Sequence, residues 1–112
     1  MINTYRTIVV IPTYNERENL NAIVDEILVM PVKNLQVLIV DDNSPDGTGK
    51  IAEHLTTIYP GRVHVLHRTA KEGLGAAYRA GFKKALELDA DYIIQMDADF
   101  SHNPDDLLRL YD

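Results

Sequence analysis

The sequence contains no cysteine in its 112 residues, which excludes a disulfide framework and a thiolate metal site and fits a reducing compartment. No apolar run approaches the roughly 20 residues that a membrane-spanning helix needs. Acidic residues outnumber basic ones and the formal net charge is -6, so no basic excess can neutralise the phosphates of a nucleic acid. The N-terminus lacks the basic and then apolar pattern of a signal peptide. These absences argue against a nucleic-acid binder and predict that any contact with a membrane is peripheral or made through a part of the protein outside these 112 residues.

Length and composition are those of one globular domain. With 46% hydrophobic and 25% charged residues, the chain resembles an ordinary soluble protein and can bury a core. No internal repeat or flexible linker divides it, so we expect residues 1–112 to form a single domain.

Short apolar runs alternate with amphipathic segments along the chain. The runs predict strands at residues 7–12, 35–41, 63–66 and 92–96. Helical spacing predicts helices from a capping box at Asn15 and Glu18 to about residue 30, from the turn at 44–47 to 59, from 73 to 88, and from 103 onward. Strands that are apolar on both faces and alternate with helices predict an α/β fold, a Rossmann-like parallel sheet with helices on both faces.

Polar side chains follow every predicted strand. Because ligands bind beyond the carboxyl ends of parallel strands, we expect these residues to meet at one edge of the sheet. They include Tyr14 and Glu16 after the first strand, Asp41 and Asp42 after the second, Arg68, Lys71, Gly73 and Gly75 after the third, and Asp97, Asp99 and Ser101 after the fourth. Taken alone, Asp41 and Asp42 fit turn chemistry, and the two glycines fit a tight helix start.

The pair Asp97 and Asp99 is harder to explain as a turn. One acid is enough to cap a turn, and two acids two residues apart can point to the same side of a strand end. Carboxylates held that close repel each other, and a counter-cation relieves the repulsion. Oxygen ligands without His or Cys favour Mg²⁺ or Mn²⁺, which commonly bind phosphate-bearing substrates as well. On spacing alone, a metal site and a solvated turn remain alternatives.

Four segments in register carry a resemblance to a known family. They are residues 10–16 (VIPTYNE), 40–48 (VDDNSPDGT), 68–75 (RTAKEGLG) and 96–104 (MDADFSHNP). Together they resemble the family 2 glycosyltransferases with a GT-A fold, and within that family they are most similar to dolichol-phosphate (polyprenol-phosphate) mannose synthases.

The resemblance implies roles for individual residues. The nucleoside of GDP-mannose is expected to contact Pro12, Tyr14, Glu16, Val40 and Asp42. Asp97, Ala98 and Asp99 are expected to form the DxD motif, with Asp97 and Asp99 as the catalytic acids that bind Mg²⁺ or Mn²⁺ and, through it, the donor diphosphate. Ser101 lies where some relatives carry a further metal contact, and Lys71 is expected near the donor.

The resemblance also implies an activity. It predicts inverting transfer of mannose from GDP-mannose to a dolichol or polyprenol phosphate, by a cytoplasmic protein peripheral to the cytoplasmic face of a membrane. Family members continue beyond this length, so the chain is expected to be the truncated, nucleotide-sugar-binding N-terminal half of a GT-A domain. Such a half is expected to be inactive alone and able to self-associate.

Three alternatives remain open at this stage. The donor can be a UDP-sugar used by another family 2 glycosyltransferase. The acids after the second and fourth strands also resemble a phospho-accepting, Mg²⁺-binding receiver domain, although the segment 12–16 then has no role. A non-catalytic nucleotide-binding module is the third.

Overall fold

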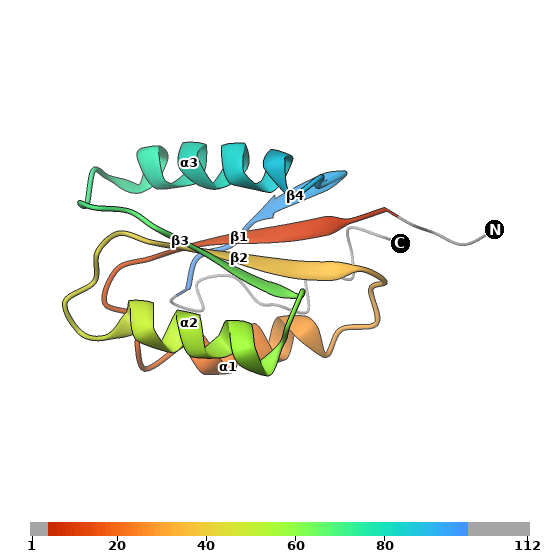
Figure 1. Ribbon diagram of the computed structural model, residues 1–112, viewed down its shortest axis with the longest axis horizontal. Helices are drawn as coiled ribbons and strands as arrows, with labels where there is room; N and C mark the ends of the chain where they lie inside the picture. The colour runs from red at the N-terminus through yellow and green to blue at the C-terminus, as the bar shows by residue number, and fades with distance from the viewer. Residues whose placement is uncertain (1–4, 99–112) are drawn as a thin grey trace.

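Four parallel strands form the centre of the computed structural model, which describes residues 5–98 (Figure 1). The strands are β1 (Thr7–Thr13), β2 (Leu35–Asp41), β3 (Val63–His67) and β4 (Tyr92–Gln95). Their order in the sheet is β3-β2-β1-β4, and every neighbouring pair is parallel. The carboxyl ends of all four strands therefore point the same way.

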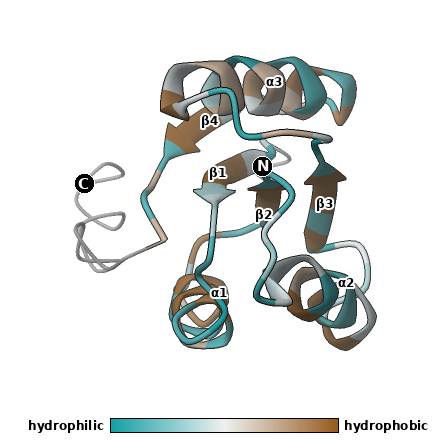
Figure 2. Cartoon of the chain, turned by 90° about the vertical axis from the view of Figure 1, so that its left-hand side faces the viewer, coloured by the Kyte–Doolittle hydropathy of each residue, from teal (hydrophilic) through white to brown (hydrophobic). Residues whose placement is uncertain are grey.

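Helices cover both faces of this sheet. α1 (Leu20–Leu28) and α2 (Thr48–Ile58) lie on one face, and α3 (Leu74–Glu87) lies on the other (Figure 1). The end-on view in Figure 2 shows the strands between these two helical layers. The predicted α/β fold class is confirmed. Within the part of the chain that the structure describes, no helix is long and apolar enough to cross a membrane.

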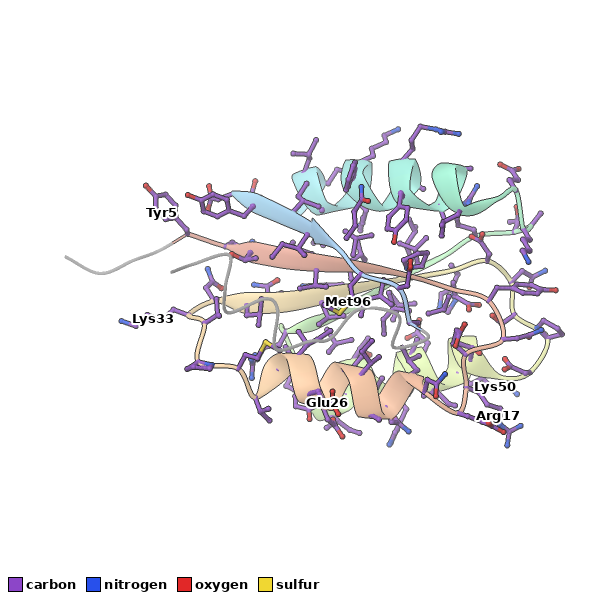
Figure 3. The ribbon with its side chains drawn as sticks, turned by 180° about the vertical axis from the view of Figure 1, so that it is seen from behind. Tyr5, Arg17, Glu26, Lys33, Lys50 and Met96 are labelled. Atoms are coloured by element: carbon purple, nitrogen blue, oxygen red, sulfur yellow. The ribbon has the colours of Figure 1, made fainter. Side chains whose placement is uncertain are left out.

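The two central strands hold the core. Every residue of β2 is buried, and β1 is buried except at Pro12. A larger apolar cluster lies on the α1 and α2 side and includes Met96, which is labelled in Figure 3, and a smaller one lies under α3. The outer strands differ from the prediction of strands buried on both faces. β3 and β4 are each paired on one side only in the described sheet, and their side chains are partly exposed.

A stripe of small residues sets α3 close to the sheet. Ala77, Gly81 and Ala85 are its buried positions. A Cβ added at Gly81 would lie 2.5 Å from Val10 Cγ1 and 3.1 Å from Val40 Cγ2, so the backbone of α3 approaches β1 and β2 as closely as only glycine allows. Leu74, in the first turn of the same helix, is 57% exposed, because this turn lies at the carboxyl edge of the sheet.

Two other sequence predictions require correction or lie outside the description. α1 begins at Leu20 and not at Asn15, and the side chain of its N-cap residue, Asn19, makes no capping hydrogen bond to the helix. The helix predicted from residue 103 lies outside the described residues.

We expect Gly81→Ala to destabilise the fold although alanine favours helix. Overpacking against Val10 costs about 1–3 kcal/mol, which outweighs the roughly 1 kcal/mol that alanine contributes to helix propensity. Chemical denaturation should show a lower free energy of unfolding. Gly75→Ala is the matched control in the same helix, because its Cβ meets only the mobile end of Arg79, and it should be neutral or stabilising. Equal stability of the two variants would contradict close packing at Gly81.

Candidate functional site

The loops after β1 and β2 are tied together by side chains at the carboxyl edge of the sheet. Three consecutive backbone N–H groups of the first loop donate to side chains of the second: Asn15 to Ser44 Oγ (3.0 Å), Glu16 to Thr48 Oγ1 (3.0 Å) and Arg17 to Asp46 Oδ2 (3.3 Å). The backbone of the first loop is thereby held away from the helical conformation at its start, and Asn15 has a left-handed φ of 57°.

These bonds explain why the predicted capping box does not form. In a capping box the Asn15 N–H would bind the Glu18 side chain. Here it binds Ser44, and the first helical turn is instead organised by the Glu16 carbonyl, which accepts from the N–H groups of Asn19 and Leu20. A contact from a distant loop has therefore displaced a local one.

Asp41 closes the base of this arrangement. Its Oδ1 accepts from the Thr13 hydroxyl (2.8 Å) and the Ser44 hydroxyl (2.6 Å), and its Oδ2 accepts from the Ser44 N–H (3.0 Å). The side chain is buried and fully engaged within the loops. Asp41 therefore performs the turn role that the sequence suggested for it.

Asp46 does the same for the start of α2. Its Oδ1 accepts from the backbone N–H of Thr48 at 3.0 Å and from the Thr48 hydroxyl. The hydrogen bond from that hydroxyl is the main cause that lowers the pKa of Asp46 below its ordinary value. Gly47, between them, has a φ of 95°, which favours glycine.

The ordered loops form one wall of a pocket of about 300 Å³ at the carboxyl edge of the sheet. Residues from β1 and the loop after it, the loop after β2, the β3–α3 loop, α3 and the segment after β4 line it. They are Pro12, Thr13, Tyr14, Glu16, Asp42, Lys71, Gly73, Leu74, Ala77, Asp97 and Ala98. The predicted residues Pro12, Tyr14, Glu16, Asp42, Lys71, Asp97 and Ala98 are thus brought together in one place.

Several residues differ from their expected positions. Val40 does not line the pocket, because its side chain is 0% exposed and packs in the cluster under α3. Thr13, Leu74 and Ala77 line it without having been predicted. The only sequence signal for Leu74 was its place between two glycines. Asp99 and Ser101 lie outside the described residues.

Asp42 is held in the pocket wall by Arg68. The two side chains form an ion pair at 3.1 Å and are only 7% and 14% exposed, and a second nitrogen of Arg68 reaches Glu72 at 3.0 Å. Arg68 is one of the polar residues predicted to gather at this edge of the sheet, but its guanidinium is engaged by these two carboxylates. Its role in this structure is to fix the direction of the Asp42 carboxylate.

Lys71 lies over the ring of Tyr14, with Nζ 4.2 Å from the ring centroid. This cation–π contact connects the loop after β1 with the loop after β3 across the pocket. Among residues 5–98, Lys71 is the one cationic residue that lines the pocket, and it lies beside three carboxylates, those of Glu16, Asp42 and Asp97. A diphosphate entering this pocket would meet net negative charge unless a cation accompanied it.

Oxygen donors of this kind suit a hard divalent cation. Mg²⁺ and Mn²⁺ prefer carboxylate oxygens, and Mg²⁺ typically takes only one or two of them from the protein. Asp97 supplies such a ligand at the pocket wall. Among residues 5–98, no group of three or more acidic, His or Cys side chains is arranged to hold a metal without help from a ligand or from other residues.

A parallel sheet covered on both faces, with a polar pocket at its carboxyl edge, defines a ligand-binding α/β domain. The chain belongs to glycosyl transferase family 2, whose family model matches residues 8–112. This membership confirms the predicted family and sets aside the receiver-domain alternative.

Two individual relatives show which members of the family the chain is similar to. The chain is 53% identical over 109 residues to polyprenol monophosphomannose synthase of Mycolicibacterium smegmatis and 50% identical over 105 residues to undecaprenyl-phosphate mannosyltransferase of Micrococcus luteus. These alignments cover 97% and 94% of the chain but 41% and 42% of the relatives, so the chain spans about two fifths of their length.

A solved structure shares the fold. A mannosyltransferase from Pyrobaculum calidifontis, in complex with GDP-Man and Mn²⁺, is 27% identical, with a TM-score of 0.68 over 86% of this chain and 28% of that one.

We expect Arg68→Ala to destabilise the protein by about 1–3 kcal/mol, because it leaves the buried Asp42 carboxylate without its charged partner. Urea denaturation measures the loss. Glu72→Ala is the control: it removes the other, 65% exposed partner of Arg68 and should change stability by less than about 1 kcal/mol. An Arg68→Ala variant as stable as Glu72→Ala would show that the ion pair does not hold the pocket wall.

Proposed function

We propose that the protein carrying this chain transfers a mannosyl group from GDP-mannose to a polyprenol phosphate, including dolichol phosphate. The observation that carries the proposal is the pocket at the carboxyl edge, which gathers most of the residues expected to contact the donor. Two relatives at least 50% identical to the chain support it by their names, a polyprenol monophosphomannose synthase and an undecaprenyl-phosphate mannosyltransferase.

Each part of the pocket has a role in this proposal. The nucleoside binds against Pro12, Tyr14, Glu16 and Asp42. The diphosphate binds beside Lys71. Asp97 and Asp99, with Ala98 between them, act as the DxD motif, and Ser101 is the third proposed metal contact. Residues 1–112 then act as the nucleotide-sugar-binding part of a GT-A domain.

The chemistry requires little proton transfer. An oxygen of the acceptor phosphate, already anionic, attacks the anomeric carbon while the bond from that carbon to the GDP diphosphate breaks. Attack from the face opposite the leaving group inverts the anomeric centre. Bound Mg²⁺ or Mn²⁺ supplies neutralisation of the negative charge that grows on the leaving diphosphate. The acceptor is a lipid, so the protein acts at a membrane surface. We propose that it does so peripherally, at the cytoplasmic face.

Calorimetric titration with GDP, UDP and GDP-mannose tests the donor, in Mn²⁺ and again in EDTA. We expect binding that needs Mn²⁺ and prefers the guanine nucleotides. Metal-dependent preference for UDP would keep the family and replace the donor with a UDP-sugar. Failure of the intact protein to bind any of the three would contradict the proposal.

The proposed metal role predicts the effect of Asp99→Ala. This change should abolish Mn²⁺-dependent GDP binding with little effect on the free energy of unfolding, because it removes a ligand and leaves the described core intact. Glu26→Ala is the control: Glu26 is an exposed acid on α1, labelled in Figure 3, so the change in net charge is the same. Undiminished GDP and Mn²⁺ binding by Asp99→Ala would exclude Asp99 as a ligand.

A further inference from the structure

One hydrogen bond reaches the proposed metal-binding segment from outside the pocket. The Tyr78 hydroxyl, on α3, donates to Asp97 Oδ1 at 2.8 Å. Asp97 lines the pocket, whereas Tyr78 does not. The two residues belong to different elements: Tyr78 lies on α3, which covers one face of the sheet, and Asp97 follows the edge strand β4 (Figure 1).

The backbone around Asp97 is already fixed. The N–H of Met96 donates to the carbonyl of Val10 at 3.1 Å, which extends the pairing of β4 with β1 by one bond. Met96 and Ala98 are each 3% exposed, so both neighbours of Asp97 are anchored in the interior. The hydrogen bond from Tyr78 holds one oxygen of the Asp97 carboxylate and so acts on the direction of that side chain.

The position of the Tyr78 hydroxyl is set by packing. Its ring packs against the apolar cluster under α3, which includes the neighbouring Ala77. Gly81, one turn further along, brings the helix so close to the sheet that a Cβ there would overlap Val10. A tyrosine side chain has few rotatable bonds. Once packing fixes the ring at this distance between α3 and the sheet, the position of the hydroxyl is therefore fixed as well.

We propose that Tyr78 is a positioning residue, which orients the Asp97 carboxylate for the divalent cation and the nucleotide diphosphate. Its catalytic consequence rests on the proposed function, but its effect on Asp97 does not. Hydrogen-bonding partners behind a metal ligand commonly change metal affinity by about 10- to 100-fold when they are removed. Tyr78 touches neither the metal nor the substrate in this assignment and acts through Asp97.

The test compares two tyrosine-to-phenylalanine changes in the intact protein. Tyr78→Phe deletes only the hydroxyl that binds Asp97. Tyr59→Phe is the matched control, because the Tyr59 hydroxyl also donates to a carboxylate, that of Asp25, at 2.6 Å, and neither residue lines the pocket.

The first readout needs no ligand. Three-bond couplings to the Asp97 carboxyl carbon, measured by NMR, should report one χ1 rotamer in the parent and in Tyr59→Phe, and averaging among rotamers in Tyr78→Phe. The second readout is Mn²⁺-dependent GDP binding. Tyr78→Phe should weaken the apparent Mn²⁺ affinity about 10-fold or more, and raising the Mn²⁺ concentration should restore GDP binding. Tyr59→Phe should match the parent.

The outcomes separate this inference from the proposed function. If the parent shows no Mn²⁺-dependent GDP binding, the proposed function fails, and the Asp97 couplings still decide whether Tyr78 orients the carboxylate. If the parent binds and Tyr78→Phe binds Mn²⁺ and GDP equally well, the inference is overturned, whatever the couplings show. Unchanged couplings in Tyr78→Phe also overturn it.

Discussion

The hydrogen bonds between the loops after β1 and β2 are the constraint on which the pocket depends. Side chains of Ser44, Asp46 and Thr48 accept three consecutive backbone N–H groups of residues 15–17, and the buried Asp41 ties the base of both loops together. Without them, the local preference of residues 15–18 is to begin a helix, and Tyr14 and Glu16 would not be held at the pocket wall. Most of the segment 40–48 therefore supports the loop after β1, and Asp42 is the residue of this segment that lines the pocket.

The remaining walls are placed by equally specific packing. α3 lies close to the sheet because Gly81 has no side chain, and this closeness brings Ala77 to the pocket and the Tyr78 hydroxyl to Asp97. Arg68, which is nearly buried, restrains the carboxylate of Asp42 in another wall of the pocket. The described residues give this pocket three carboxylates and one ammonium group, a balance of charge that suits a phosphate ligand only when a cation accompanies it.

Two errors in the sequence-based predictions have the same physical cause, which is competition from contacts distant in the chain. Asn15 and Glu18 have the spacing of a capping box, but the Asn15 N–H binds Ser44, 29 residues away. Arg68 has the charge for a phosphate contact, but Asp42 and Glu72 engage it. Val40 belongs to a segment typical of the family, yet the alternation of side chains along β2 turns it into the core under α3.

The sequence by itself determined the order of strands and helices along the chain, because hydrophobic periodicity is a local property. The alternation of strands and helices then implied a parallel sheet covered on both faces, and with it the edge at which polar residues gather. It also carried the four segments that identify the family. Only the tertiary structure decided which polar residues face the pocket and which support it. Asp41 and Asp42 are adjacent in the chain, yet the Asp41 carboxylate is hydrogen-bonded within the loops, whereas Asp42 lines the pocket. That division depends on which distant partners reach each carboxylate, and residue spacing does not encode those partners.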